Sequence, residues 1–219
     1  MIFVNYKTFE ESSGPKALLL TKILEEAAHE SQVKIIPVVQ IIDAESVTSS
    51  TTLEVWIQHV DPVSYGAHTG WTLPEEAARV GVSGVFLNHS EHKFDNFDTL
   101  KTANEKAMSI NLKTLIFAGN LDELKKISEL ASTYVAYEPP ELVGSVTTSV
   151  AEAQPEVISQ AVEIARSAGL PLIVGAGIHN LSDVKKSLEL GAVGVAVATD
   201  IVKSVDPKKE LMELTEGFK

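Results

Sequence analysis

Three side chains capable of acid–base chemistry each follow a short apolar segment of the chain. Lys7, His89 and Glu138 all stand where such a segment ends. A carboxylate can take a proton from carbon, an imidazole can exchange one with oxygen, and an ammonium group can stabilise developing negative charge. If the fold brings the three together, they predict proton abstraction next to a carbonyl group.

Two further apolar segments end in small residues. Gly175-Ala176-Gly177 follows one of them, and Ala198-Thr199 follows the other. Small residues allow backbone N–H groups to approach a phosphate closely. A phosphate grip beside an acid, a base and a cation predicts a phosphorylated substrate.

Each feature also has an ordinary structural explanation. A lysine such as Lys7 is usually solvated, and a histidine such as His89 is usually a hydrogen-bonded core or loop residue. Glu138 could be a turn residue before Pro139 and Pro140. Glycines after a strand can serve close packing alone. The functional interpretation therefore depends on their joint occurrence at the ends of successive apolar segments.

The elements that must position these residues alternate regularly. The apolar, β-branched segments predict strands buried on both faces; they are residues 2–6, 33–39, 53–60, 84–88, 113–118, 134–137, 171–174 and 193–197. Amphipathic spacing predicts helices between them, at 16–29, 156–168 and 181–190. Residues 180–183 could cap the last of these, and Gly169 and Gly191 stand where helix C-caps are expected.

Alternating strands and helices predict an α/β protein with a parallel sheet and outer helices. The unbroken alternation over eight units favours a single domain, residues 1–219, closed into a (β/α)8 TIM barrel. The competing fold is an open doubly wound sheet, which would place a G-x-G-x-x-G turn after the first strand. That turn is missing, because Asn5-Tyr6-Lys7 stands there. In a barrel, chemistry lies at the C-terminal ends of the strands.

Composition narrows the possible partners and cofactors. The formal net charge of −12, without a basic block, argues against nucleic acid or an anionic membrane surface as a partner. Cysteine is absent, which excludes disulfides and thiolate chemistry. We see neither a signal peptide nor a membrane span and expect a cytoplasmic protein. His89, Glu91 and His92 are close in sequence, but no H-E-x-x-H pattern accompanies them, so we expect no metal and no cofactor.

Four motifs together resemble the triosephosphate isomerase family along the whole chain, in its shorter archaeal form. They are Asn5-Tyr6-Lys7, Gly66-Ala67-His68-Thr69-Gly70, Asn88-His89-Ser90-Glu91 and Tyr137-Glu138-Pro139-Pro140, with the following Glu141-Leu142-Val143-Gly144 and Gly175-Ala176-Gly177-Ile178 typical of the short form. The resemblance implies an isomerase of glycolysis and gluconeogenesis, which interconverts dihydroxyacetone phosphate and glyceraldehyde 3-phosphate through an enediolate.

The resemblance also implies catalytic roles. Glu138 would be the base that moves the proton between C1 and C2. His89 would polarise the carbonyl oxygens as a neutral imidazole, held neutral by a short helix after Ser90. Lys7 would stabilise the enediolate, Asn5 would orient the substrate, and Glu91 would hold Lys7 through an ion pair.

Phosphate binding and self-association follow from the same resemblance. Residues 139–149 would form a lid, with Gly144 donating a backbone N–H to the phosphate. Gly177, Ala198 and Thr199 would complete the grip with backbone groups. Thr69 would reach into a neighbouring subunit, which implies a homo-oligomer, either a dimer or a tetramer.

The chain departs from the family pattern at two places. The lid reads Gly144-Ser145-Val146 where the family has Gly-Thr-Gly, and the loss of the last glycine predicts a stiffer, slower lid. Asp200 stands beside the phosphate grip where related sequences carry a small residue. A carboxylate there could cap a helix or repel the ligand, and we expect it to point away from the phosphate.

Two rival functions remain at this stage. A Schiff-base aldolase would need a buried lysine near the carbonyl, commonly on the sixth strand, where this chain has Glu138. A catalytically inactive barrel that binds sugar phosphates is the alternative from a different class. Intact Lys7, His89 and Glu138 argue against it, because a binding protein has no use for a base aimed at carbon.

Overall fold

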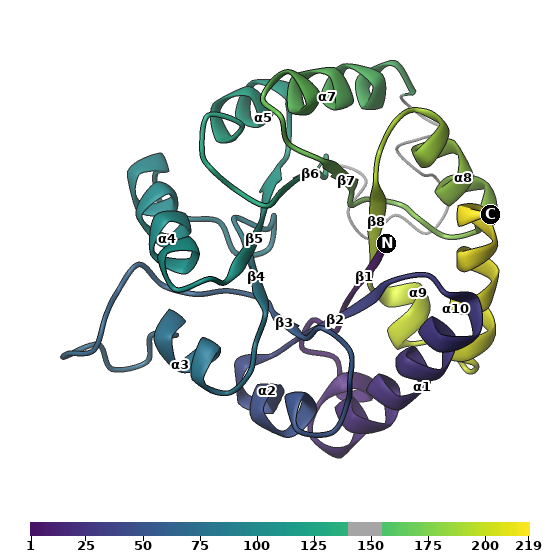
Figure 1. The fold of residues 1–219 in the computed structure, drawn as a ribbon, viewed down its shortest axis with the longest axis horizontal. Helices are drawn as coiled ribbons and strands as arrows, with labels where there is room; N and C mark the ends of the chain where they lie inside the picture. The colour runs from purple at the N-terminus through teal and green to yellow at the C-terminus, as the bar shows by residue number, and fades with distance from the viewer. Residues whose placement is uncertain (140–154) are drawn as a thin grey trace.

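The computed structural model describes residues 1–139 and 155–219. Within them, eight parallel strands pair in chain order and form a closed barrel (Figure 1). Ile2 of the first strand pairs with Ile35 on one side and with Val195 on the other, so the last strand returns to the first. The predicted (β/α)8 TIM barrel is confirmed.

Strands and helices alternate around the ring, with the helices outside (Figure 1). The strands are β1 (Ile2–Asn5), β2 (Ile35–Val39), β3 (Trp56–Ile57), β4 (Gly84–Leu87), β5 (Lys113–Ala118), β6 (Tyr134–Tyr137), β7 (Leu172–Val174) and β8 (Gly194–Val197). The helices are α1 (Pro15–Ser31), α2 (Ile41–Thr48), α3 (Pro74–Arg79), α4 (Phe97–Ser109), α5 (Leu121–Ile127), α7 (Pro155–Ser167), α8 (Leu181–Glu189), α9 (Thr199–Val202) and α10 (Pro207–Thr215). Short 3-10 helices cover Glu10–Ser12 and Glu216–Phe218.

The predicted helix ends are confirmed at α7 and α8. Asn180 caps α8 by accepting hydrogen bonds from the backbone N–H groups of Ser182 and Asp183, and the Asp183 carboxylate accepts a hydrogen bond from the Asn180 N–H. This reciprocal capping box satisfies N–H groups that the helix itself leaves free. Gly169 and Gly191 follow α7 and α8 with φ of 73° and 105°, a conformation that favours glycine.

The third strand is shorter than predicted. The apolar pattern indicates 53–60, but pairing with the neighbouring strand β2 involves only Trp56 and Ile57. Gln58 is the first residue after the ladder, and its side-chain amide donates to the carbonyl oxygen of Lys7 at 2.8 Å. An apolar sequence pattern indicates which residues are buried, whereas the length of a strand depends on how many of its residues pair with the neighbouring strands.

Aromatic side chains fill the barrel interior. Phe3 packs on Trp56 and on Phe86 at ring-centroid distances of 5.0 and 5.6 Å, and Phe86 packs on Phe117 at 4.8 Å. Gly84 makes room for this packing, because a Cβ there would stand 2.3 Å from Cε2 of Trp56. The interior is thus a packed core, and a ligand must bind at the rim above it.

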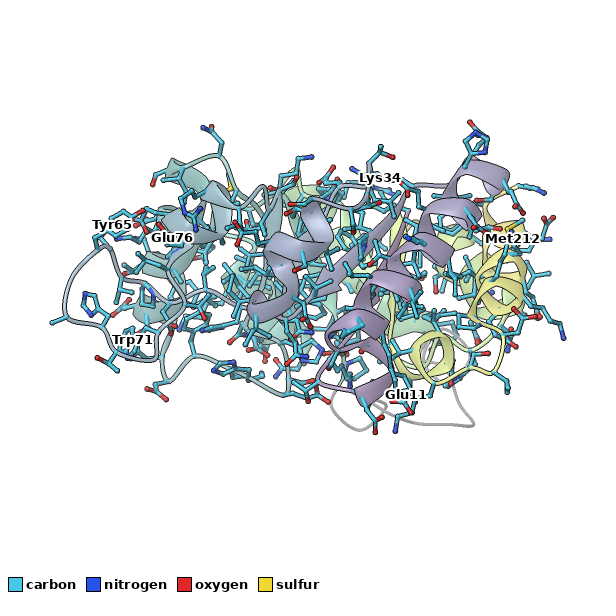
Figure 2. All side chains as sticks on the ribbon, turned by 90° about the horizontal axis from the view of Figure 1, so that it is seen from below. Glu11, Lys34, Tyr65, Trp71, Glu76 and Met212 are labelled. Carbon is cyan, nitrogen blue, oxygen red and sulfur yellow. The ribbon has the colours of Figure 1, made fainter. Side chains whose placement is uncertain are left out.

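A long loop between β3 and α3 projects away from the barrel at the left of Figure 1. Figure 2 shows Tyr65 and Trp71 on this loop, with Tyr65 close to Glu76 of α3; the Tyr65 hydroxyl donates to Oε1 of Glu76 at 2.7 Å. Tyr65 and Trp71 are 67% and 53% exposed. In the part of the chain that the structure describes, no helix has the length and apolarity needed to cross a membrane.

Candidate active site

A pocket opens at the C-terminal ends of the strands and collects most of the predicted site residues. Those lining it are Asn5, Lys7, His89, Glu138, Gly177, Ala198 and Thr199. Five different strands, β1, β4, β6, β7 and β8, deliver them to one place. The structure thus brings together side chains and loops that lie far apart in the sequence.

Lys7 is held in an unusual backbone conformation. Its φ is 48°, and its N–H donates to Oδ1 of Asn5 at 3.0 Å. Gln58 binds the Lys7 carbonyl, and Nζ of Lys7 lies 2.7 Å from Oε1 of Glu91. The expected Lys7–Glu91 ion pair is therefore present. Left-handed backbone in a non-glycine residue costs free energy, so these bonds are what keep the ammonium group at the pocket.

His89 does not stand before a short helix, contrary to the expectation. Residues 90–92, all described by the structure, form a turn closed by a hydrogen bond from the His92 N–H to the His89 carbonyl, at 2.8 Å. The next helix, α4, begins only at Phe97. Asparagine side chains here bind backbone N–H groups and so compete with helix formation. Oδ1 of Asn88 accepts from the Phe94 N–H, and Asn96 caps the N-terminus of α4.

The turn itself fixes the tautomer of His89. The Glu91 N–H donates to Nδ1 of His89 at 3.2 Å, so Nδ1 acts as an acceptor and carries no proton. A neutral ring then holds its proton on Nε2, which faces Glu138. In the neutral imidazole that the resemblance implies, this backbone N–H in the turn therefore selects the tautomer that carries its proton on Nε2. Phe117 supports the ring from below, at a centroid distance of 4.9 Å.

A buried polar network sets the backbone before His89. Asn88 has a φ of 59° and donates through Nδ2 to the Phe117 carbonyl and to Oε1 of Glu123, both at 2.9 Å. Glu123 also accepts from the Gly119 N–H and from Lys93. Burial alone would raise the pKa of Glu123, but the bonds from Lys93, Gly119 and Asn88 outweigh it and lower that pKa. Glu123 therefore remains an anchor for Asn88.

Glu138 follows β6 and is buried with its carboxylate at the pocket. Oε2 accepts from Oγ of Ser90 at 3.0 Å and lies 3.4 Å from Nε2 of His89. Gly175 lies next to this side chain, since a Cβ there would stand 3.4 Å from Cβ of Glu138, close to an ordinary van der Waals contact. The hydrogen bond from Ser90 thus helps to fix where the carboxylate lies.

Small residues from the loops after β7 and β8 also line the pocket. Gly177 has a φ of 62°, and Ala198-Thr199 begins the short helix α9. The first N–H groups of a helix lack partners within it and can bind an anion. Asp200 lines the same pocket, with Oδ2 turned onto Nδ1 of His179 at 2.5 Å. Its orientation relative to a bound phosphate remains a prediction.

Three expectations do not fall in this pocket. Thr69 is exposed and belongs to the loop between β3 and α3, which projects away from the barrel (Figure 1). Gly144 and the lid substitutions Ser145-Val146 lie outside the described residues, as does most of the lid segment. Glu91 does not line the pocket itself and contacts the pocket residues Lys7, through its carboxylate, and His89, through its backbone N–H.

Sequence reasoning missed four contributors: Gln58, Asn88, Glu123 and His179. Asn88 stands next to His89, so an asparagine at the end of a strand was an available signal for left-handed backbone. His179 lies two residues after Gly177 in the loop that follows β7. Gln58 and Glu123 act through contacts between distant segments, for which the sequence carries no local signal.

The charges at this site are mostly negative. Among the described lining residues Lys7 is the one lysine or arginine, and it is paired with Glu91, whereas Glu138 and Asp200 both carry carboxylates. In the same residues, no group of three or more histidine, cysteine or acidic side chains is arranged to hold a metal ion. The pocket offers a buried carboxylate, an imidazole, one ammonium group and a backbone cradle, an arrangement suited to proton transfer at a carbonyl carbon.

Known proteins agree with this chemistry. The triosephosphate isomerase family model matches residues 1–216. The chain is similar to the triosephosphate isomerases of Thermoplasma volcanium (35% identical, over 97% of this chain and 98% of the relative) and Methanothermus fervidus (37%, over 98% and 96%). It is 38% identical to that of Metallosphaera sedula, over 99% of this chain and 95% of the relative. On this evidence the chain belongs to the triosephosphate isomerase family.

Proposed function

We propose that Glu138 is the base of the isomerisation, with His89 as the proton donor at oxygen and Lys7 as the stabilising charge. The observation that carries this proposal is the convergence of Glu138 and His89, whose Oε2 and Nε2 atoms lie 3.4 Å apart in one buried pocket. Triosephosphate isomerase is itself the standard example of a glutamate base working with a neutral histidine.

The reaction begins at C1 of dihydroxyacetone phosphate. Glu138 takes a proton from C1, and the C–H electron pair forms a C1–C2 double bond while the carbonyl electrons move to O2. Lys7 and the Nε2–H of His89 stabilise the negative charge on O2. His89 gives its proton to O2 and recovers one from O1; Glu138 then returns its proton to C2, which yields the aldehyde at C1.

The phosphate would be held across the pocket by backbone groups of Gly177, Ala198 and Thr199. These residues line the same pocket as His89 and Glu138, so the reacting carbons would lie within reach of both side chains. Asn5 orients the substrate near Lys7 in this arrangement, and Glu91 fixes the Lys7 ammonium group. Gly144, in the lid, would donate its backbone N–H to the phosphate.

We also propose that residues 1–219 act as one domain and that the protein self-associates in the cytoplasm, as a dimer or a tetramer, with no nucleic acid or membrane partner. Self-association is supported by the projecting loop, whose tip exposes Thr69 between the large side chains of Tyr65 and Trp71. Apolar surface of this kind is typical of an interface.

The experiment that tests the proposed function is a coupled assay of glyceraldehyde 3-phosphate conversion, with borohydride added in a parallel reaction. We expect rapid conversion that borohydride does not stop, because no Schiff base forms. Covalent trapping of the substrate by borohydride would instead indicate the aldolase mechanism. Phosphate binding without conversion would indicate the inactive barrel.

A further inference from the structure

Three aromatic rings meet beside the turn of residues 89–92, which we call the His89 turn. His59 lies two residues after β3, and its side chain is 13% exposed. Its ring stacks on the ring of His92, with a centroid distance of 4.1 Å and an interplanar angle of 25°, and lies 5.1 Å from the ring of Phe94. His59 is not among the described residues that line the pocket, and the isomerisation described above does not use it.

The base of the projecting loop holds His59 in place. Nε2 of His59 is hydrogen-bonded to Oδ1 of Asp61, at 3.2 Å. The second oxygen of Asp61 accepts from the Thr72 N–H at 2.6 Å, and the Asp61 N–H donates to the Thr72 carbonyl at 2.9 Å. Asp61 and Thr72 stand on the two arms of the loop, so the bonds that close the loop also fix the carboxylate that holds the ring.

His92 connects the ring of His59 to the His89 turn. The His92 N–H donates to the His89 carbonyl at 2.8 Å and closes the turn. Within the same turn, the Glu91 N–H donates to Nδ1 of His89 at 3.2 Å. His92 is an exposed residue, so its packing against the more buried ring of His59 limits how far the turn can move.

Phe94 makes a second connection to the same segment. Its N–H donates to Oδ1 of Asn88 at 3.3 Å, and Asn88 directly precedes His89. The Phe94 side chain packs against the hydrophobic core as well as against His59. His59 therefore contacts two residues, each of which binds His89 or the residue before it through a backbone N–H.

The position of the His89 turn matters for the reaction. Nε2 of His89 lies 3.4 Å from Oε2 of Glu138, and the two groups must reach neighbouring atoms of one substrate. A small displacement of a reacting group lowers the rate steeply, whereas it changes substrate binding much less when the binding contacts lie elsewhere. The ring contacts of His59 act on the backbone from which His89 extends.

We propose that His59 is a positioning residue of the isomerisation, because its ring packs against His92 and Phe94 and so holds the turn that directs Nε2 of His89 toward Glu138. The inference rests on the proposed function, which assigns proton transfer at oxygen to His89. His59 acts through His89 and not on the substrate. Loss of its ring therefore lowers kcat, while binding at the phosphate end stays the same.

The test compares kcat and KM in the coupled assay for the wild type, His59→Ala and His59→Phe. We expect His59→Ala to lower kcat roughly tenfold, with KM within about twofold of the wild-type value. His59→Phe loses the bond to Asp61 but keeps a ring that can stack, so its kcat should return to within about threefold of the wild type.

His92→Ala removes the same stack from its exposed side and leaves the core intact, so it tests the contact even if His59→Ala folds poorly. Its kcat should also fall, and the double variant His59→Ala/His92→Ala should lie no more than about twofold below His59→Ala. Inhibition by inorganic sulfate, which competes at the phosphate end, should stay within about twofold in every variant. His29→Ala, at an exposed histidine of α1, is the control and should match the wild type.

A wild-type kcat in both His59→Ala and His92→Ala would overturn the proposal. Equal losses in His59→Ala and His59→Phe would also overturn it, because the ring would then not be the important feature, and so would losses that multiply in the double variant. A wild type that does not convert substrate, or full activity of His89→Gln, would instead contradict the proposed function, so the two failures can be told apart.

Discussion

Oε2 of Glu138, at the end of β6, lies 3.4 Å from Nε2 of His89, at the end of β4. The two side chains are 6% and 10% exposed, so solvent does not separate them. A base at carbon and a proton donor at oxygen must reach neighbouring atoms of one substrate, and this spacing allows it. Substituting the residues that position Glu138 and His89 is therefore more informative about the mechanism than substituting these two residues alone.

The Glu123 network should control how well His89 is positioned. Replacing Glu123→Gln removes the charge that anchors Asn88, whose left-handed backbone leads directly into His89. We expect kcat to fall by roughly ten- to a hundredfold with little change in KM, because a small displacement of a reacting group is costly.

Lys93→Ala is the matched control for that change. Lys93 pairs with the same carboxylate at 2.9 Å but is 40% exposed. An exposed ion pair contributes little, so kcat should stay within about twofold of the wild type. Equal losses in the two variants would argue against positioning through Asn88.

Gly84 should be essential for packing inside the barrel. A Cβ at this position would stand 2.3 Å from the indole of Trp56, which is fully buried. Gly84→Ala is expected to lower the free energy of unfolding by roughly 1–3 kcal/mol or more, as measured by chemical denaturation. In a Trp56→Leu background the same change should cost less, and a cost that does not depend on the Trp56 replacement would contradict the packing argument.

His59 should make stability depend on pH below neutrality. Burial and, to a smaller extent, the stacked His92 lower its pKa in the folded protein. The unfolded chain therefore binds more protons below its ordinary pKa of about 6.5, and the free energy of unfolding falls as the pH decreases from there.

Denaturation at neutral and at mildly acidic pH tests this. His59→Gln should lose less stability on acidification than the wild type. His29→Gln, which changes an exposed histidine of α1, should behave like the wild type. An equal pH dependence in all three proteins would show that His59 is not responsible.

The projecting loop should mediate self-association. Thr69→Arg places a bulky charge at its exposed tip, and sedimentation should then show a smaller species than the wild type at the same concentration. Thr102→Arg, at an exposed threonine of α4, should leave the assembly unchanged. A monomeric wild type, or an unchanged Thr69→Arg assembly, would contradict the proposed interface.

Much of the fold could be predicted because strand and helix periodicity is local. The N-terminus of α8 is an example, since Asn180 and Asp183 form the capping box that their spacing indicates. The length of β3 could not be predicted in the same way, because it depends on pairing with a strand far away in the sequence.

The convergence of the proposed catalytic residues was predictable for a related reason. A parallel barrel gathers the C-terminal ends of its strands, so the strand ends at Lys7, His89 and Glu138 were sufficient to expect one pocket. The turn after Ser90 was not predictable, because the side chain of Asn88 takes a backbone N–H that a helix would need. The contact between His179 and Asp200 joins the loop after β7 to helix α9, and neither residue alone indicates the other.

The central claim is that Glu138 moves the proton between the two carbons. The most direct measurement compares kcat/KM of the wild type and Glu138→Gln, which keeps the shape of the side chain but accepts no proton from carbon. We predict a loss of roughly 10²- to 10⁴-fold, with sulfate still bound competitively. A glutamine variant with nearly wild-type activity would contradict this account.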